Sequence, residues 1–255
     1  MIPYFYMRVV FHDETKQAKY LVTGLPGIGR VGHVAAAYII NKARPVLVAD
    51  IFSEYFPQQV VIEENGVLRL IRNRLYYVDA KNPFFILTGD SQPVGSSPSE
   101  FYEYTAEILD LAKQLGVEEI YTLAGIDRGA QRLTEKPGVV VAATDEDIVK
   151  RFVELGAKVD KGGAITGLAG MLLGLGKLEG FRGACLMGET STQLTMHGDP
   201  GAALAVTKMI LSYLGNELDL SDLENAAEGF EALLRKMVTP PKEEPKPPEP
   251  TDYIR

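Results

Sequence analysis

The sequence has little of what several protein classes require. It holds one cysteine, Cys185, in 255 residues, which excludes an internal disulfide and a zinc cluster built from cysteines. Acidic residues outnumber basic ones by 34 to 26, and this net charge of −8 argues against a protein that binds nucleic acid. The longest apolar stretch, residues 164–178, is too short to span a bilayer and is interrupted by four glycines.

The N-terminal residues also lack the basic region, apolar run and cleavage site of a signal peptide. The composition is otherwise that of a folded globular protein, with 46% hydrophobic and 24% charged residues. A chain of this length can bury a substantial core. We therefore expect a cytoplasmic protein without nucleic-acid or membrane partners.

Residues for common catalytic or metal sites are sparse as well. The three histidines, His12, His33 and His197, are far apart and form no paired metal-binding motif. Cys185 lies in an apolar strand segment, which favours a buried structural thiol over a nucleophile. No Gly-x-Ser-x-Gly elbow occurs. We expect no catalytic residues, no metal and no cofactor.

What the sequence does contain is an alternation of apolar runs and helical patterns. Strands are expected at residues 20–24, 45–50, 84–90, 120–125, 139–144 and 182–189. Helices are expected at 29–42, 99–115, 201–214 and 220–237, and a further helix begins at Thr144. Ser99 is the expected cap of the second of these helices. Residues 59–63 and 67–72 flank Asn65-Gly66, a strong hairpin signal, and a further strand at 75–78 completes an antiparallel meander. This order predicts an α/β fold with a mainly parallel sheet, covered on both faces, and the meander at one edge.

The composition changes sharply at Thr239. Residues 239–255 contain six prolines and little that is apolar, which predicts an extended tether with a reach of roughly 50 Å at ~3.1 Å per residue. Tyr253 and Ile254 restore hydrophobic character at the tip, so the segment is either a frayed terminus or a tethered docking peptide. We expect one α/β domain over residues 1–238 and a Pro-rich flexible tail over 239–255.

The sharpest motif is Gly27-x-Gly29-x-x-Gly32, which lies between an expected strand and an expected helix. Asp50 follows eighteen residues later, at the end of the next strand. This is the context of a dinucleotide-binding fingerprint, in which glycines admit the pyrophosphate and the acid binds the ribose. A tight strand-to-helix turn with a closely packed helix explains the same glycines. No Gly-Lys-Ser/Thr follows, so a P-loop is excluded.

Other loops at expected strand ends allow two readings each. Asp90 and Gln92 follow the strand at 84–90, at the sheet edge where α/β proteins bind ligands, although Asp90 could instead bond local backbone amides. Residues 125–129 and 189–192 also follow expected strands and could either contact a ligand or serve the loop alone. In the first of these segments the adjacent charges of Asp127 and Arg128 could pair at the surface. Small residues at three- and four-residue spacing in 167–174 indicate core packing or, second, a subunit interface.

In order and spacing, five motifs resemble the PAC2 family, named for proteasome assembly chaperone 2, and in particular its archaeal homologues. They are Gly24 to Gly32, Gly89-Asp90-x-Gln92-Pro93, Ala143-Thr144-Asp145, Gly163 to Leu173 and Glu189-Thr190. The resemblance spans about residues 21–214. It implies a three-layer α/β fold like that of nucleoside phosphorylases, homo-oligomers or pairs with a paralogue, and no established catalytic residues.

Family members that act on the proteasome resemble regulators ending in a hydrophobic-Tyr-any motif, which inserts between α-subunits. Here Tyr253 is third from the end instead of second, and Asp252 precedes it where a hydrophobic residue is expected. Either Tyr253, Ile254 and Arg255 form a variant anchor, or Ile254 takes the aromatic position, or proteasome docking is absent.

Three functional hypotheses follow from this resemblance and from the motifs. The leading one is a non-enzymatic, oligomeric assembly chaperone that docks proteasome α-subunits through its tail. The alternative is a nucleotide- or small-molecule-binding protein or enzyme, with a site at the Gly27–Gly32 loop, Asp50, Asp90 and Gln92. The third is a scaffold subunit whose tail binds an unrelated partner.

Overall fold

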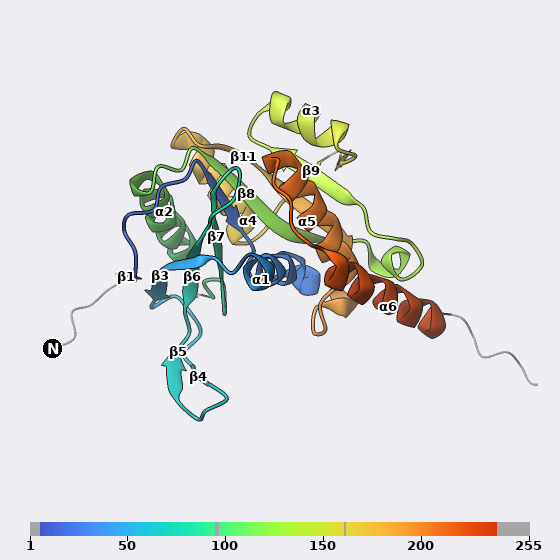
Figure 1. The fold of residues 1–255 in the computed structure, drawn as a ribbon, viewed down its shortest axis with the longest axis horizontal. Coiled ribbons are helices and arrows are strands. Elements are labelled where there is room, and N and C mark those ends of the chain that lie inside the picture. The colour runs from blue at the N-terminus through green and yellow to red at the C-terminus, as the bar shows by residue number, and fades with distance from the viewer. Residues whose placement is uncertain (1–5, 95–96, 161, 239–255) are drawn as a thin grey trace, which may run out of the picture.

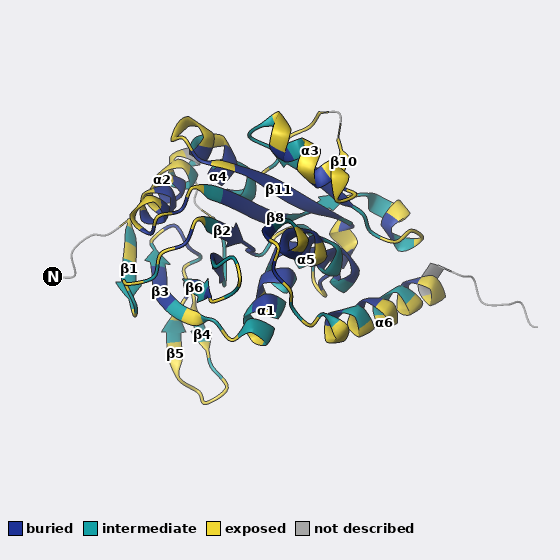
Figure 2. Ribbon diagram, turned by 45° about the horizontal axis from the view of Figure 1, so that its top comes forward, coloured by how far each residue is buried: buried dark blue, intermediate teal, exposed yellow. Residues whose placement is uncertain are grey.

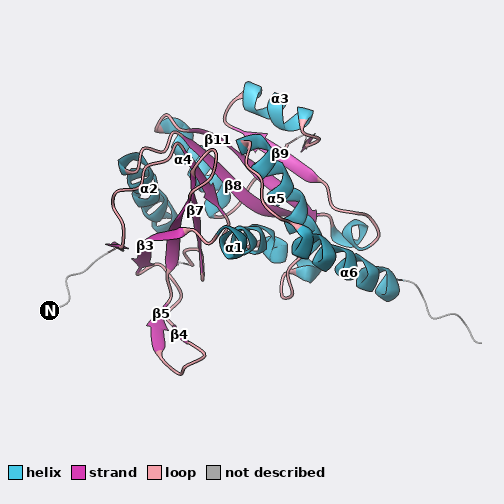
Figure 3. Cartoon of the chain, in the orientation of Figure 1, coloured by secondary structure: helices cyan, strands magenta, loops and turns pink. Residues whose placement is uncertain are grey.

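The computed structural model describes residues 6–94, 97–160 and 162–238. Within them, nine strands form one sheet in the order β1-β3-β6-β7-β2-β8-β11-β9-β10 (Figures 1 and 3). These strands are β1 (Met7–Phe11), β2 (Tyr20–Thr23), β3 (Val46–Ser53), β6 (Asn73–Val78), β7 (Phe84–Gly89), β8 (Glu119–Asp127), β9 (Val139–Ala143), β10 (Lys158–Val159) and β11 (Arg182–Thr190).

The centre of the sheet is parallel, and antiparallel pairs flank it on both sides. Strands β7, β2, β8 and β11 run in the same direction. On one side, β1, β3, β6 and β7 pair antiparallel, and on the other β9 is antiparallel to β11. The expected α/β fold, with parallel strands in the middle and antiparallel strands at the edge, is confirmed.

Helices cover both faces of the sheet, as the alternating sequence pattern predicts. They are η1 (Ile28–Arg30), α1 (Val31–Ala43), α2 (Pro98–Gln114), η2 (Gly129–Leu133), α3 (Glu146–Glu154), α4 (Leu168–Leu178), η3 (Thr192–Leu194), α5 (Pro200–Leu214) and α6 (Ser221–Val238). Helices α2 and α4 contribute to the core on one face, and α1, α3 and α5 to the core on the other. Helix α6 packs outside α5 (Figure 1).

Alternation along the central strands divides their side chains between these two cores. On β2, Leu21 faces the α2 side and Val22 faces the α1 side, and both are almost completely buried. On β8, Ile120 and Tyr121 divide in the same way. Because both faces are covered, the central strands are mainly apolar, and they are buried along most of their length (Figure 2).

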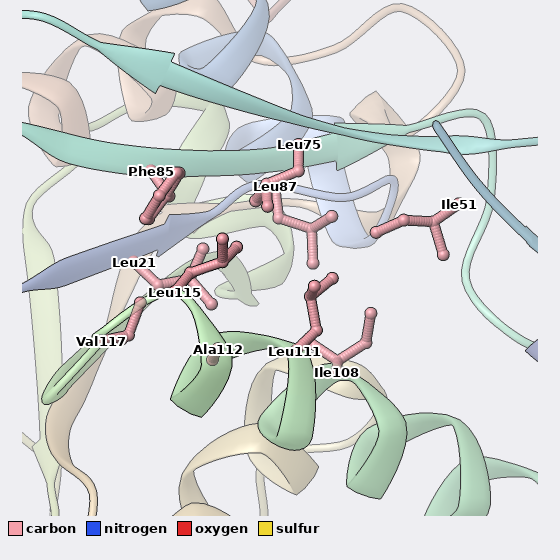
Figure 4. Close-up of a pocket in the computed structure, with 10 residues that line it drawn as sticks. All are labelled: Leu21, Ile51, Leu75, Phe85, Leu87, Ile108, Leu111, Ala112, Leu115 and Val117. Carbon is pink, nitrogen blue, oxygen red and sulfur yellow. The ribbon is translucent and has the colours of Figure 1, made fainter. Parts of the chain in front are cut away.

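The core beneath α2 is closely packed. Ile108, Leu111 and Leu115 repeat at helical spacing and meet Leu21 and Phe85 from the sheet (Figure 4). The void between them is only about 10 Å³, which at most holds roughly one water molecule. Burying each large aliphatic or aromatic side chain here stabilises the fold by about 1.5–3 kcal/mol.

Two local expectations need correction. The expected hairpin forms, as β4 (Val60–Ile62) and β5 (Leu68–Leu70), but it leaves the main sheet and makes a separate two-stranded projection (Figure 1). The expected cap of α2 at Ser99 is wrong by two residues. Ser97 is the cap and accepts a hydrogen bond from the Ser99 N–H, because Pro98 occupies the first helical position, where no N–H is needed.

Arg132 is the largest fully buried side chain among the described residues. Its guanidinium makes two hydrogen bonds to the Asp199 carboxylate, of 2.7 and 2.8 Å, and one of 2.6 Å to Glu231. Asp199 also accepts hydrogen bonds from the Thr190 hydroxyl and from the Ala202 N–H, and so caps α5. The cluster therefore ties η2, β11, α5 and α6 together.

We expect Asp199→Ala to lower the free energy of unfolding by about 3–5 kcal/mol, because it leaves the Arg132 charge buried without its main partner. Urea denaturation followed by circular dichroism measures the loss. The matched control is Lys113→Ala, which breaks the exposed Lys113–Glu179 pair and should leave stability nearly unchanged. Equal stability of the Asp199→Ala and wild-type proteins would contradict the structural role of the buried cluster.

Candidate functional site

The glycine loop joins β2 to α1 at the carboxyl end of the central strands. Gly29 and Arg30 both adopt left-handed backbone conformations, with φ of 59° and 49°, before α1 begins at Val31. The loop is held from the other side by the segment after β11. There the Thr195 hydroxyl accepts from the Gly29 N–H, and the Asp199 N–H donates to the Gly29 carbonyl.

At two of the three glycines of the motif, other atoms of the protein fill the space that a side chain would take. A Cβ on Gly32 would lie 2.0 Å from the Leu123 carbonyl oxygen, and one on Gly29 would lie 2.3 Å from the Thr190 hydroxyl oxygen. Gly27 alone of the three has space, with its nearest neighbour, Gln92 Nε2, at 3.7 Å. The close approach that these glycines permit is therefore between the α1 end of the loop and the strands β8 and β11.

The structure does not bring Asp50 to this loop. Asp50 is on β3, which is separated from β2 by β7 and β6, or by roughly 14 Å at the usual strand spacing. In a dinucleotide-binding fold, the strand that supplies the acid lies next to the strand that leads into the glycines. Here the Asp50 carboxylate accepts hydrogen bonds from His12 Nε2 at 2.9 Å and from Arg72 at 3.2 Å.

Asp90 bonds a backbone amide, but that of Arg72, 18 residues earlier, and not one of its own loop as the second interpretation expected. Its carboxylate accepts from the Arg72 N–H at 3.0 Å and pairs with the Arg69 guanidinium of the projecting hairpin. Burial alone would raise the pKa of Asp90, but Arg69 and the Arg72 amide hold it below its ordinary value. Asp90 thus fixes the base of the hairpin.

Gln92 joins the glycine loop to the N-terminus of α4. Its Nε2 donates to the Pro26 carbonyl at 2.6 Å, and its Oε1 accepts from the Leu168 N–H at 2.8 Å. Both ends of the amide are therefore used by the protein itself. Nothing in the sequence pattern around Gln92 indicates this second partner, which lies 76 residues away.

Behind Gln92 lies a cavity of about 210 Å³ at the carboxyl ends of β2 and β8. It brings together the sequence candidates Gly27, Gly32 and Gln92. Its walls also include Thr23, Leu25, Ile28, Leu123, Ala124, Gly125, Ile126, Asp127, Ala164, Ile165, Thr166, Gly167, Leu168, Ala169 and Met187. These walls are mainly apolar, and the described residues that form them include no lysine or arginine.

The charged residues at the ends of β8 and β11 have partners both nearby and far away in the sequence. Asp127 accepts from the Gly129 and Thr192 N–H groups, which lower its pKa. Arg128 does not pair with Asp127; it pairs with Glu189 and Asp160. These residues build the rim of the sheet edge.

The Glu189 carboxylate at this rim has both ion-pair and backbone hydrogen-bond partners. Burial alone would raise its pKa, but Lys158, the Gly138 N–H and Arg128 together hold the pKa of Glu189 below its ordinary value. It is therefore ionised near neutral pH and serves as an acceptor for its neighbours. No sequence motif indicates Lys158 as a partner of Glu189; it lies in the short strand β10.

The reactive side chains examined in the sequence have ordinary structural positions. Cys185 is completely buried, and burial raises the pKa of its thiol to about 11. Burial and the nearby Arg30 lower the pKa of His33. Among the described residues, no three His, Cys, Asp or Glu side chains are grouped as a metal site would require. Every helix in that part of the chain is too short or too polar to cross a bilayer.

The small residues of α4 divide between two environments. Gly170 packs against Ile165, where an added Cβ would lie 2.2 Å from the carbonyl oxygen, whereas Gly174 has no neighbour within 4 Å of that position. Core packing therefore explains Gly170 but not Gly174. The tail candidates Tyr253, Ile254 and Arg255 lie outside the described residues.

We expect Gly32→Ala to destabilise the protein by about 1–3 kcal/mol or more, because its methyl group would overlap the Leu123 carbonyl. Gly174→Ala is the matched control. It adds the same methyl group at an open helical position and should stabilise by up to about 1 kcal/mol. Thermal unfolding of the two variants measures both effects. A neutral Gly32→Ala would mean that the glycine loop is loosely packed and its glycines serve another purpose.

Comparison with known proteins gives one consistent relationship. The model of the PAC2 family matches residues 21–238. An uncharacterised protein from Methanocaldococcus jannaschii is 32% identical over 232 residues, which cover 90% of this chain and 87% of that protein.

Two crystal structures from Pyrococcus furiosus are similar over nearly their full lengths. PbaB, an archaeal proteasome activator, has 32% identity and a TM-score of 0.81, with 91% of this chain and 98% of PbaB covered. PbaA, an archaeal homolog of proteasome-assembly chaperone, has 28% identity and a TM-score of 0.73, with 91% and 92% covered. With the family match extending from β2 to the end of α6, this chain belongs to the PAC2 family.

Proposed function

We propose that this protein is a non-enzymatic, oligomeric regulator of proteasome assembly or activity, which docks proteasome α-subunits through residues 239–255. The observation that carries the proposal is the similarity to PbaB, a proteasome activator, over 91% of this chain and 98% of PbaB. PbaA, a homolog of proteasome-assembly chaperone, supports the same class of partner.

The position of α6 suits the presentation of a tail. The helix is fixed along its length by Glu231 to the buried Arg132, by Glu224 to Lys208, and by Asp222 to Lys42. Its C-terminal end points away from the sheet at the edge of the molecule (Figures 1 and 2). A segment that continues from Val238 therefore starts from a fixed point directed outward.

Weak individual tails would bind through avidity. An anchor of three residues, Tyr253, Ile254 and Arg255, has little surface to bury, so a single tail should bind weakly. A symmetric oligomer presents several tails to a ring of α-subunits at high effective concentration, which raises the overall affinity by 10²–10⁴-fold without new contacts. Homo-oligomerisation, or assembly with a paralogue, is thus part of the proposal.

The geometry favours this function over nucleotide binding. The glycines of the loop pack against Leu123 and Thr190, and Asp50 is three strands away from them. Among the described residues, the cavity walls also offer a nucleotide no lysine or arginine to balance its phosphates.

Tyr253→Ala should abolish binding to proteasome α-subunits while leaving the fold and the oligomer unchanged, because it removes the aromatic anchor of the tail. Size-exclusion chromatography with light scattering, with and without purified α-subunits, measures both properties. Thr251→Ala is the matched control, since it changes a neighbouring tail residue without removing an apolar group.

Deletion of residues 239–255 should give the same loss of binding as Tyr253→Ala. A truncated protein that still comigrates with α-subunits would refute the tail mechanism. A full-length protein that is oligomeric but never comigrates with them would refute the proteasome as its partner.

A further inference from the structure

We propose that the cavity of about 210 Å³ behind Gln92 is a binding site for a small, mainly apolar molecule with one hydrogen-bond-accepting group, a carboxylate or a carboxamide. The Thr23 hydroxyl and the N-terminus of α4 bind that group. The site is distinct from a pyrophosphate cradle on the glycines and independent of tail docking.

The cavity lies where the topology of the sheet opens a crevice. After β2 the chain passes through α1 towards β3 on one side, whereas after β8 it passes towards β9 on the other. The two parallel strands are neighbours, so their outgoing connections separate at their carboxyl ends. Ligand sites in open α/β sheets lie at such switch points.

Thr23 supplies a polar group at the cavity that the described part of the chain does not use. The residue is 3% exposed, lines the cavity and makes no side-chain hydrogen bond with the described part of the chain. Its partner in register on β8, Thr122, donates to the Ala169 carbonyl at 3.2 Å, and Thr88 on β7 donates to the Gly24 carbonyl at 2.7 Å. The Thr23 hydroxyl oxygen is therefore not sealed in the core but open to the cavity, where it is available to a ligand.

The N-terminus of α4 adds a second donor at the same wall. Gln92 takes the Leu168 N–H, but the next amide, of Ala169, belongs to the first turn of the helix, where no intrahelical acceptor exists. Leu168 and Ala169 both line the cavity. The positive end of the helix dipole there favours a carboxylate or carbonyl oxygen.

The remaining walls select the body of the ligand. Leu25, Ile28, Leu123, Ile165 and Met187 are apolar, so most of the molecule must be apolar too. Among the described lining residues, Asp127 is the one charged side chain. Its repulsion disfavours a doubly charged phosphate more than a singly charged carboxylate, and a neutral carboxamide least. A dry cavity of 150 Å³ holds benzene, so this one suits a molecule of about eight non-hydrogen atoms.

The probes are 4-methylpentanoate and 4-methylpentanamide, which have eight non-hydrogen atoms each, with 4-methylpentan-1-amine as the control that lacks an acceptor of this kind. They are titrated to millimolar concentration into the full chain carrying ¹³C-labelled methionine methyl groups. Met187 lines the cavity and should shift with saturation, whereas Met209, in the core on the other face of the sheet, should not. Tighter binding of the carboxylate than of the amide would mean that the natural ligand is an anion held by the positive end of the α4 dipole. Tighter binding of the amide would mean that the natural ligand is neutral.

The variants separate the site from general stability. Thr23→Val should weaken probe binding about tenfold with no loss of thermal stability, because its hydroxyl has no partner to lose. Thr23→Ser should retain binding. The matched control, Thr122→Val, should lower the melting temperature and still bind, since it removes a hydrogen bond within the protein.

Two results would overturn the assignment. One is that neither acid nor amide shifts Met187 more than Met209 or more than the amine does. The other is that Thr23→Val binds the probes as tightly as the wild-type protein. If the valine variant does not fold, the contradicting result is that Thr23→Ser, which keeps the hydroxyl, loses probe binding.

Discussion

A buried charge that must have a partner organises this molecule. The Arg132 guanidinium lies almost without exposure between Asp199 and Glu231, and desolvation makes it unfavourable unless both carboxylates stay in place. Through Asp199 the requirement reaches the cap of α5, the end of β11 and the Gly29 carbonyl. Through Glu231 it reaches α6, the helix that precedes the tail. One ion cluster thus connects the glycine loop to the base of the segment proposed to bind the proteasome.

The glycine loop shows how one sequence pattern can serve two kinds of close approach. In a dinucleotide-binding protein the missing Cβ atoms make room for a pyrophosphate, whereas here they make room for the Leu123 carbonyl and the Thr190 side chain. The packed loop leaves a cavity beside it, which Gln92 bridges at its rim. The same carboxyl edge of the sheet therefore keeps the usual place of a ligand site without the phosphate-binding chemistry.

The local elements were largely predictable because their signals are short-range. Mainly apolar runs predicted β2, β7, β8 and β11, and the Asn65-Gly66 turn predicted the hairpin. Strand β1 was not predicted, since it is a half-buried edge strand that pairs only with β3. The direction of β9 and the departure of the hairpin from the sheet depend on pairings and ion pairs between distant segments, such as Arg69 with Asp90. Local patterns do not encode such pairings.

By itself, the sequence determined the α/β class, the positions of most helices and strands, the motifs of the PAC2 family and the sharp change of composition at Thr239, because each is written in periodicity, composition or motif order. Tertiary structure decided which of the candidate residues meet. It separated Asp50 from the glycines, turned Gln92 into a bridge to α4, and left the Thr23 hydroxyl beside a cavity without a hydrogen bond to the described residues. The physical reason is that strand order and long-range hydrogen bonds set these distances, and neither is fixed by the spacing of residues along the chain.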